Sequence, residues 1–298
     1  MMGQKIRVPI KRAFACLLSA VVSLLGLVIA PSRLSADVIG YAVTQPSNGG
    51  IGAQDQLYSV DLSTHAATLL GSTATGPGSF VDIDGLALSP NQTLYATDGS
   101  GVLYTLNKAN GAATAIGSTG LGAVRGLHFL GNTLLGTNTG DPTTIYSINT
   151  TTPSNTTPVV TFSQGVSRAL TLENSNTALV PSDSPATPSL ISVNLTTGAN
   201  TVLGPINTLS GTMAAMDFDS SLTTLYGLDA LGNEYTINPL NGNTTLVGNT
   251  GGAFFYTDLA ISPLQQSAPE PASVAMLCTG LLAVWGIGVR RRDPIAVR

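Results

Sequence analysis

The chain has 298 residues, of which only 9% are charged, while 33 are glycine and 17 are proline. This composition favours an all-β domain with many turns over a helical one. Between residues 37 and 268 there are 14 acidic and 3 basic residues, which gives a formal charge of −11. So acidic a segment offers no basic surface to nucleic acid and is repelled by anionic lipid. We therefore expect no nucleic-acid partner.

The first 36 residues predict a signal peptide that directs export through the secretion machinery. Residues 5–12 are basic, residues 13–30 form an uncharged apolar run, and small residues follow, with cleavage by signal peptidase expected after Ala36. An uncleaved membrane anchor is the alternative, because the run is long for a signal peptide. Cys16 lies near the start of the run instead of after it, which argues against a lipoprotein.

One short motif occurs five times in the middle of the chain, at 57–61 (LYSVD), 103–107 (LYTLN), 145–149 (IYSIN), 190–194 (LISVN) and 234–238 (EYTIN). The second residues of these segments are 46, 42, 45 and 44 positions apart. Three further motifs share this period, and their first copies are VIGYAVT at 38–44, ATLLG at 67–71 and DGLAL at 84–88. All are alternating or β-branched and are bounded by turn residues, so each repeat predicts four strands.

Four antiparallel strands at this period are typical of one blade of a β-propeller. The order of the motifs resembles that of NHL and lactonase-like propellers, in which the Gly-Leu-Ala-Leu strand is innermost. The predicted domain, 37–263, begins with a second-strand motif at Val38 and ends with an inner-strand motif at 257–262. The last strand can therefore complete the first blade, which closes a five-bladed ring, removes two exposed sheet edges and brings Asp37 close to Ser262. An open or sandwich-like arrangement is the alternative.

The aligned inner strands predict one charged constellation around a channel mouth, formed by Asp84, Arg125, Arg168 and Asp258. It is either a structural ion-pair network between blades, since buried charges must be paired, or a site for a polar ligand such as a sugar or a carboxylate. A misaligned repeat is the third explanation.

The resemblance to lactonase-like propellers also implies a calcium ion near the axis, held by carboxylate and amide oxygens. The candidate ligands are Asp82, Asp84 and Asp217, with Asp219 and Asp258 as further oxygen donors. The alternative is that Asp82 and Asp217 are turn or surface residues. We expect no cofactor other than this calcium candidate.

Catalytic motifs are missing from the sequence, which has no Gly-x-Ser-x-Gly, no His-Glu-x-x-His and no phosphate-binding loop. Of the two histidines, His65 lies in a predicted turn and is expected to be solvated, whereas His128 lies in an inner strand and is expected to be hydrogen-bonded in the core or between blades. A non-enzymatic binding or structural module is therefore the leading hypothesis. A calcium-dependent lactonase-like hydrolase is the alternative, and a self-assembling surface coat is a third reading.

The C-terminal segment has three parts in a fixed order. A linker at 264–271 contains a Pro-Glu-Pro triplet, an 18-residue uncharged run at 272–289 is just long enough to span a bilayer as a transmembrane helix, and a basic tail at 290–298 stays cytoplasmic. The residues that define the pattern are Pro269, Glu270, Pro271, Arg290, Arg291 and Arg292.

This order resembles the PEP-CTERM sorting signal of Gram-negative bacteria over residues 268–293. The resemblance implies that an exosortase, a membrane cysteine transpeptidase, recognises the tail and cuts near the triplet. It also implies an inner-membrane-anchored precursor, delivery to the cell surface or extracellular matrix, and a host that makes exopolysaccharide or biofilm matrix. An ordinary single-span anchor is the alternative.

Overall fold

The computed structural model describes residues 38–45, 55–76, 81–165, 169–182, 188–208, 213–219, 221–251 and 255–261. All of them belong to one compact unit, Asp37–Arg298, whereas Met1–Ala36 form a second unit. The predicted signal peptide and the predicted tail helix lie outside the described residues. Within the described ranges, no helix has the length and hydropathy needed to cross a membrane.

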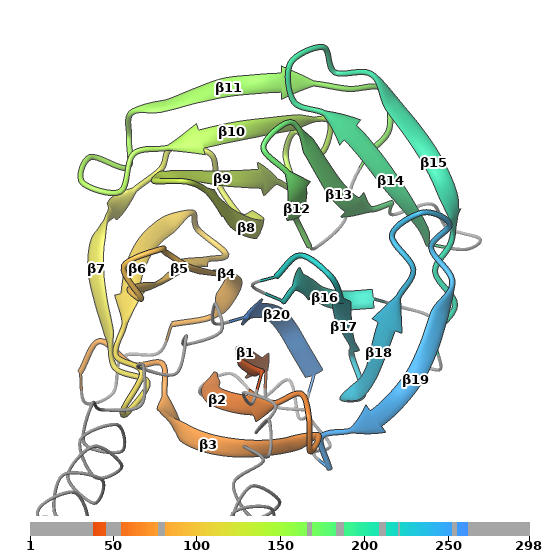
Figure 1. Ribbon diagram of the computed structural model, residues 1–298. Coiled ribbons are helices and arrows are strands. Elements are labelled where there is room, and N and C mark those ends of the chain that lie inside the picture. The colour runs from red at the N-terminus through yellow and green to blue at the C-terminus, as the bar shows by residue number, and fades with distance from the viewer. Residues whose placement is uncertain are drawn as a thin grey trace, which may run out of the picture. The chain divides into compact units, whose positions relative to one another are not determined.

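The described strands form five antiparallel sheets of four strands, arranged as blades in a ring (Figure 1). This arrangement confirms the predicted five-bladed propeller. From the inner to the outer strand, the blades are β20 (Phe255–Ile261), β1 (Ile39–Gln45), β2 (Gln56–Asp61) and β3 (Ala66–Ser72); β4 (Ile83–Leu88), β5 (Leu94–Asp98), β6 (Val102–Leu106) and β7 (Ala113–Ser118); β8 (Val124–Leu130), β9 (Thr133–Asn138), β10 (Thr144–Ile148) and β11 (Thr156–Thr161); β12 (Thr171–Asn174), β13 (Thr177–Pro181), β14 (Ser189–Asn194) and β15 (Asn200–Pro205); and β16 (Met213–Phe218), β17 (Leu225–Asp229), β18 (Asn233–Ile237) and β19 (Thr244–Asn249).

Strands from the two ends of the domain close the ring. β20 pairs antiparallel with β1, with Gly40 opposite Ile261 and Ala42 opposite Leu259. β20 also contacts the inner strands β4 and β16 of the two neighbouring blades (Figure 1). The predicted closure is therefore confirmed, and the inner edge of the first blade is supplied by the last strand of the domain.

Each blade builds its outer hairpin around an Asp or Asn side chain at the end of the third strand. The Oδ1 atom of this residue accepts a hydrogen bond from the backbone N–H two residues later, which fixes the turn locally. The five residues are Asp61, Asn107, Asn149, Asn194 and Asn238. The last residue of the recurring LYTLN-type motif is therefore a turn residue, which explains why its type recurs.

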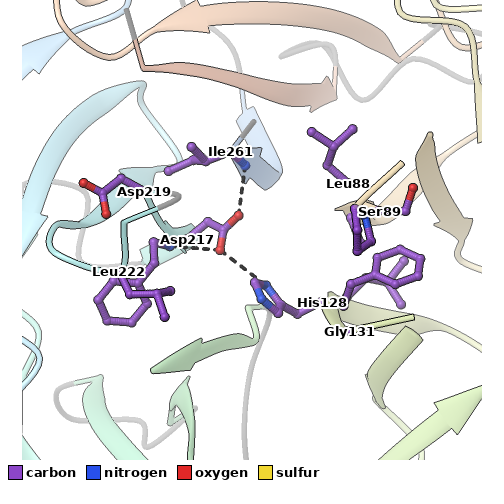
Figure 2. A pocket seen from close by; sticks show the side chains of 13 residues that line it. Leu88, Ser89, His128, Gly131, Asp217, Asp219, Leu222 and Ile261 are labelled. Carbon is purple, nitrogen blue, oxygen red and sulfur yellow. Dashed lines mark hydrogen bonds and ion pairs between the residues drawn. The ribbon is translucent and has the colours of Figure 1, made fainter. Parts of the chain in front are cut away.

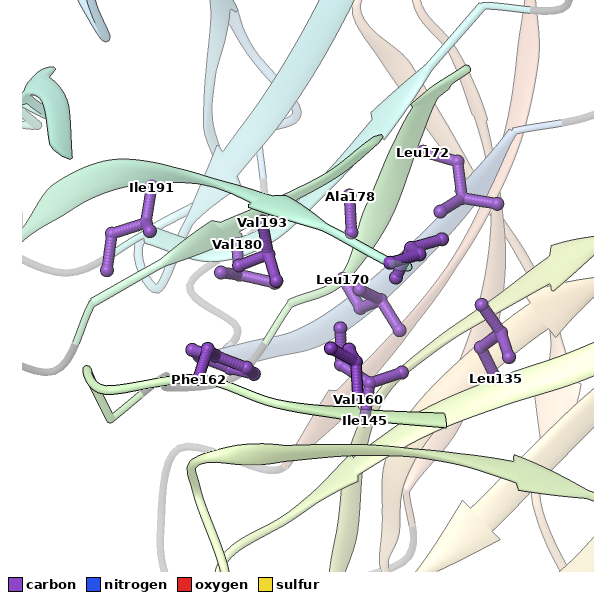
Figure 3. Packing of buried hydrophobic residues seen from close by; sticks show 11 residues of the cluster. Leu135, Ile145, Val160, Phe162, Leu170, Leu172, Ala178, Val180, Ile191 and Val193 are labelled. Atoms are coloured by element: carbon purple, nitrogen blue, oxygen red, sulfur yellow. The ribbon is translucent and has the colours of Figure 1, made fainter. Parts of the chain in front are cut away.

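Much of the core lies between adjacent blades. Ile145 and Val160, from β10 and β11, lie in one cluster with Val180, Ile191 and Val193 from the next blade (Figure 3). Alternation along the strands sends every second side chain to this face. Each such aliphatic side chain stabilises the fold by about 1.5–3 kcal/mol when fully buried, so the inter-blade clusters hold the ring together.

Glycines of the outer strands let neighbouring blades approach closely. A Cβ atom on Gly71 would lie 2.0 Å from the carbonyl oxygen of Asn110 in the next blade, and one on Gly204 would lie 2.0 Å from that of Asn241. Only glycine tolerates such an approach of two backbones. At the seam where the last blade meets the first, the imidazole of His65 occupies the corresponding place over Gly248.

His65 lies in a turn, as predicted, and its side chain is 30% exposed, but it is not simply solvated. Its Nδ1 atom lies 3.0 Å from Oε2 of Glu234, whose side chain is fully buried. Burial raises the pKa of Glu234, while the hydrogen bond from His65 acts in the opposite direction. The ion pair joins the first blade to the last, across a seam that brings distant parts of the sequence together. A local sequence pattern therefore could not indicate it.

Candidate functional site

The inner strands surround a pocket of about 330 Å³, here called the axial pocket. It is formed where β4, β8, β16 and β20 end and by the turns that follow (Figure 2). Most of its wall is apolar, with four polar side chains among the described residues that line it. The residues labelled in the figure are Leu88, Ser89, His128, Gly131, Asp217, Asp219, Leu222 and Ile261. An apolar pocket of this size with a few polar groups is typical of a small-molecule site.

His128 and Asp217 form the polar centre of the axial pocket. Nδ1 of His128, on β8, lies 3.3 Å from Oδ1 of Asp217, on β16 (Figure 2). The inter-blade position expected for His128 is therefore confirmed. The alternative placement of Asp217 in a turn or on the surface is wrong, because Asp217 lies within a strand and is 7% exposed.

The carboxylate of Asp217 is held by hydrogen bonds from three inner strands. Oδ1 accepts the hydroxyl of Thr171 at 2.8 Å and the amide of Phe218 at 2.9 Å, and Oδ2 accepts the amide of Ile261 at 2.9 Å. Inner strands are sheet edges, so their axis-facing amides need partners other than a further strand. Asp217 supplies such a partner and, at the same time, orients the His128 ring.

The other polar side chains of the pocket, Ser89 and Asp219, are committed to their own turns. The Ser89 hydroxyl donates to the Thr93 carbonyl at 2.9 Å and accepts the Thr93 amide at 3.0 Å. Asp219 accepts the amide of Thr223 at 2.8 Å and the hydroxyl of Ser221 at 3.0 Å. Burial acts to raise the pKa of Asp219, but these bonds outweigh it and keep the pKa below its usual range. Among the described polar side chains that line the pocket, this leaves Nε2 of His128 to face a ligand.

Leu222 stands at the pocket with a backbone conformation that is unusual for leucine. Its φ is 55°, and its side chain is 51% exposed. The corresponding turns after β8 and β4 have Gly131 and Gln92 in the left-handed region, with φ of 57° and 66°. A bulky residue in this region costs about 1–2 kcal/mol. No sequence pattern indicates Leu222, because only its backbone angle distinguishes it from any other turn residue.

The residues predicted for the charged channel mouth have different surroundings. Arg125 Nε lies 3.5 Å from Oδ1 of Asp84, so the structure brings these two together at the start of β4 and β8. Arg168 lies outside the described residues. The structure thus joins one acid and one base of the four.

Asp258 links two inner strands in the way that Asp217 does. Its Oδ2 accepts the amide of Leu86 on β4 at 2.7 Å, and its Oδ1 accepts the amide of Leu259 at 2.9 Å. Complete burial raises its pKa well above the usual range, and the charge of Asp217 acts in the same direction. These contacts give Asp258 an inter-blade structural role.

Asp55, which the sequence analysis did not single out, lies beside two of the calcium candidates. Its Oδ2 accepts the amide of Ile83 at 2.6 Å. Burial raises the pKa of Asp55 to about 8, and the charges of Asp82 and Asp84 act in the same direction. In the part of the chain that the structure describes, no group of three or more His, Cys, Asp or Glu side chains is arranged to hold a metal ion. The calcium site remains a prediction from the resemblance.

Comparison with known proteins supports the fold and does not reach the site. No protein-family model matches the sequence, and no curated protein matches it. Among solved structures, a chain in the crystal structure of a nidogen/laminin complex aligns with a TM-score of 0.51 at 14% identity, over 76% of this chain and 99% of that one. TolB from Acinetobacter baumannii aligns with a TM-score of 0.49 at 13% identity, over 87% and 74%. At 14% identity, the likeness to the chain of the nidogen/laminin complex is one of fold alone.

Proposed function

We propose that the chain is an exported surface or extracellular-matrix protein whose propeller is a non-enzymatic binding module, with the axial pocket as its binding site. The observation that carries the proposal is the make-up of this pocket. Its wall is apolar, and a single imidazole, oriented by Asp217 from across the ring, presents a ring nitrogen to a ligand. This combination is typical of small-molecule recognition.

The Ser89 hydroxyl is already hydrogen-bonded within its own turn, which favours binding over hydrolysis. A hydrolase of the Ser-His-Asp type needs a hydroxyl within hydrogen-bond reach of the imidazole. Ser89 lines the same pocket as His128, but its hydroxyl is engaged by both backbone groups of Thr93. Among the described residues that line the pocket, His128 and Asp217 therefore have an orienting geometry without the hydroxyl that would complete a Ser-His-Asp triad.

The leader and the tail support the delivery part of the proposal. In this view an exosortase recognises the segment around Pro269–Pro271, and the processed domain reaches the envelope surface or a matrix that contains exopolysaccharide. The strand that ends at Ile261 is complete before the triplet begins. Cleavage at the triplet would thus leave all five blades intact.

A binding and turnover experiment on the secreted protein tests the module. We expect fragments to bind by ligand-observed NMR, no turnover of a lactone and ester panel, and no change in melting temperature between calcium and chelator. A chelator-sensitive melting temperature together with lactone turnover would favour the calcium-dependent hydrolase instead. If no fragment bound at the axial pocket, the proposed binding role would be wrong.

A second experiment tests sorting in a host that has an exosortase. Alanines at Pro269–Pro271 should leave a larger, membrane-associated precursor, whereas alanines at 264–266 in the same linker should be processed normally. Equal processing of both variants would refute recognition of the triplet.

A further inference from the structure

We propose that the axial pocket takes an uncharged, largely apolar small molecule with one hydrogen-bond donor, such as a phenol or an alcohol, and that Nε2 of His128 accepts this donor. The inference rests on the proposed binding function and names its ligand class. It follows from three features of the pocket: the position of the imidazole proton, the absence of a counter-charge and the placement of Leu222.

The contact with Asp217 places the imidazole proton on Nδ1. The Nδ1 atom faces a carboxylate oxygen at 3.3 Å, and a lone pair in that position would be repelled. In the neutral ring the other nitrogen then carries the lone pair and is a hydrogen-bond acceptor. Because Asp217 is itself fixed by Thr171 and Ile261, it holds the ring in one orientation, and turning the ring would break the contact with Asp217. The pocket therefore presents a fixed acceptor.

The charges around the pocket disfavour ionic ligands. An anion would meet the carboxylates of Asp217 and Asp219, while no Lys or Arg is among the described residues that line the pocket. A cation would have to displace the amide and hydroxyl donors that these carboxylates already accept. A neutral molecule avoids the repulsion that an anion meets and leaves these hydrogen bonds in place.

The rest of the pocket wall is apolar and therefore favours a ligand with apolar surface. Leu88, Phe129 and Ile261 line the pocket together with Leu222, and the side chains of Leu88 and Leu222 lie on opposite sides of His128 (Figure 2). Leu222 keeps a positive φ of 55° while its side chain is half exposed. Strained residues persist mainly at functional sites. A ligand that covers the Leu222 side chain would explain why leucine occupies this position despite its unfavourable backbone conformation.

Three probes that differ in one group test the ligand class on the full secreted chain. Naphthol has a hydroxyl donor, its methyl ether has none, and naphthoate is an anion. By isothermal titration calorimetry, naphthol should bind about tenfold more tightly than the ether, which is the usual contribution of one hydrogen bond. Naphthoate should bind more weakly than either.

Two variants locate the contacts, and a third is their matched control. His128→Asn keeps an N–H toward Asp217 and removes the Nε2 acceptor, so naphthol affinity should fall to that of the ether. Leu222→Gly removes the apolar cover, so naphthol and its ether should both bind about tenfold more weakly. Because glycine adopts a positive φ without strain, the melting temperature should be equal or higher. Gln92→Gly makes the same change in the equivalent turn after β4, at a residue that does not itself line the pocket, and should leave binding unchanged.

The outcomes separate the ligand class from the proposed function. Preferred binding of naphthoate, equal binding of naphthol and its ether, or no effect of His128→Asn would overturn the ligand class. If Leu222→Gly still weakened binding, the pocket would stand as the site. If bound probes responded equally to Leu222→Gly and Gln92→Gly, the pocket would not be the site, and both proposals would fail. If none of the three probes bound, the ligand class would be wrong and the fragment experiment would decide the function.

Discussion

Replacing Asp55 with asparagine should remove a large part of the pH dependence of stability. Burial raises the pKa of Asp55 from 3.8 to about 8, with help from Asp82 and Asp84. Between these two values the folded protein retains a proton that the unfolded chain has released. The free energy of unfolding therefore falls as the pH rises. The stabilising contribution is complete below about pH 4 and is lost as the pH approaches 8.

The magnitude follows from the two pKa values. A pKa difference of one corresponds to about 1.4 kcal/mol, so the interval from 3.8 to about 8 corresponds to at most about 6 kcal/mol. Asp55 is only 4% exposed, so solvent screens little of this effect. Asparagine can still accept the amide of Ile83. We therefore expect Asp55→Asn to resemble the wild type near pH 4 and to exceed it by roughly 3–6 kcal/mol near pH 8.

Urea unfolding followed by circular dichroism at several pH values between 4 and 8 measures this difference. Asp61→Asn is the control. Burial acts to raise the pKa of Asp61, but hydrogen bonds from its turn outweigh it and keep the pKa below 3.8. Both states of Asp61 are therefore ionised above about pH 5, and its replacement should leave the slope unchanged. Equal slopes for the wild type and Asp55→Asn would show that Asp55 does not retain a proton in the folded protein over this range.

Three other substitutions test the contacts that hold the ring together. Gly71→Ala places a Cβ 2.0 Å from a backbone oxygen of the next blade and should lower the free energy of unfolding in urea by about 1–3 kcal/mol. The control Gly120→Ala has a positive φ but open space and should cost about 1 kcal/mol. Equal losses would contradict the close approach of the two blades at Gly71. His65→Ala should cost about 2–4 kcal/mol in thermal unfolding, because it leaves the buried Glu234 without its partner. Adding Glu234→Gln should restore most of the loss. If it did not, the packing of the imidazole over Gly248 would be the contact that stabilises the seam. Asp217→Ala should cost about 2–5 kcal/mol and speed amide exchange at the end of β20, and unchanged exchange would show that this carboxylate does not tie the blades together.

The fold could be predicted because its determinants are local and repeated. Strand alternation at 57–61 and 103–107, with a turn residue such as Asn107 at the end, specifies a hairpin without reference to the rest of the chain. Closure was also predictable, because the missing inner strand of the first blade recurs as the last motif, at 257–261. The strand pattern is therefore readable within one repeat, and closure needs only a comparison of the first and last repeats.

The site could be predicted only in part, because its contacts cross the ring. The sequence draws attention to His128 as an inner-strand histidine and to Asp217 as a possible calcium ligand, which are unrelated reasons. Their pairing depends on which inner-strand side chains point to the axis, and no repeat period encodes that. Leu222 becomes visible only by comparison with Gly131, whose place in the turn shows that a left-handed residue is needed there.

The seam that closes the first blade ends beside the axial pocket. Ile261 lines the pocket and ends β20, and its partner Gly40 lies at the start of β1. The amide of Ile261 also donates to Asp217, the carboxylate that orients His128. Closure of the ring and the polar centre of the pocket therefore share one residue. A small molecule bound in the pocket should thus also oppose opening of the propeller at this seam.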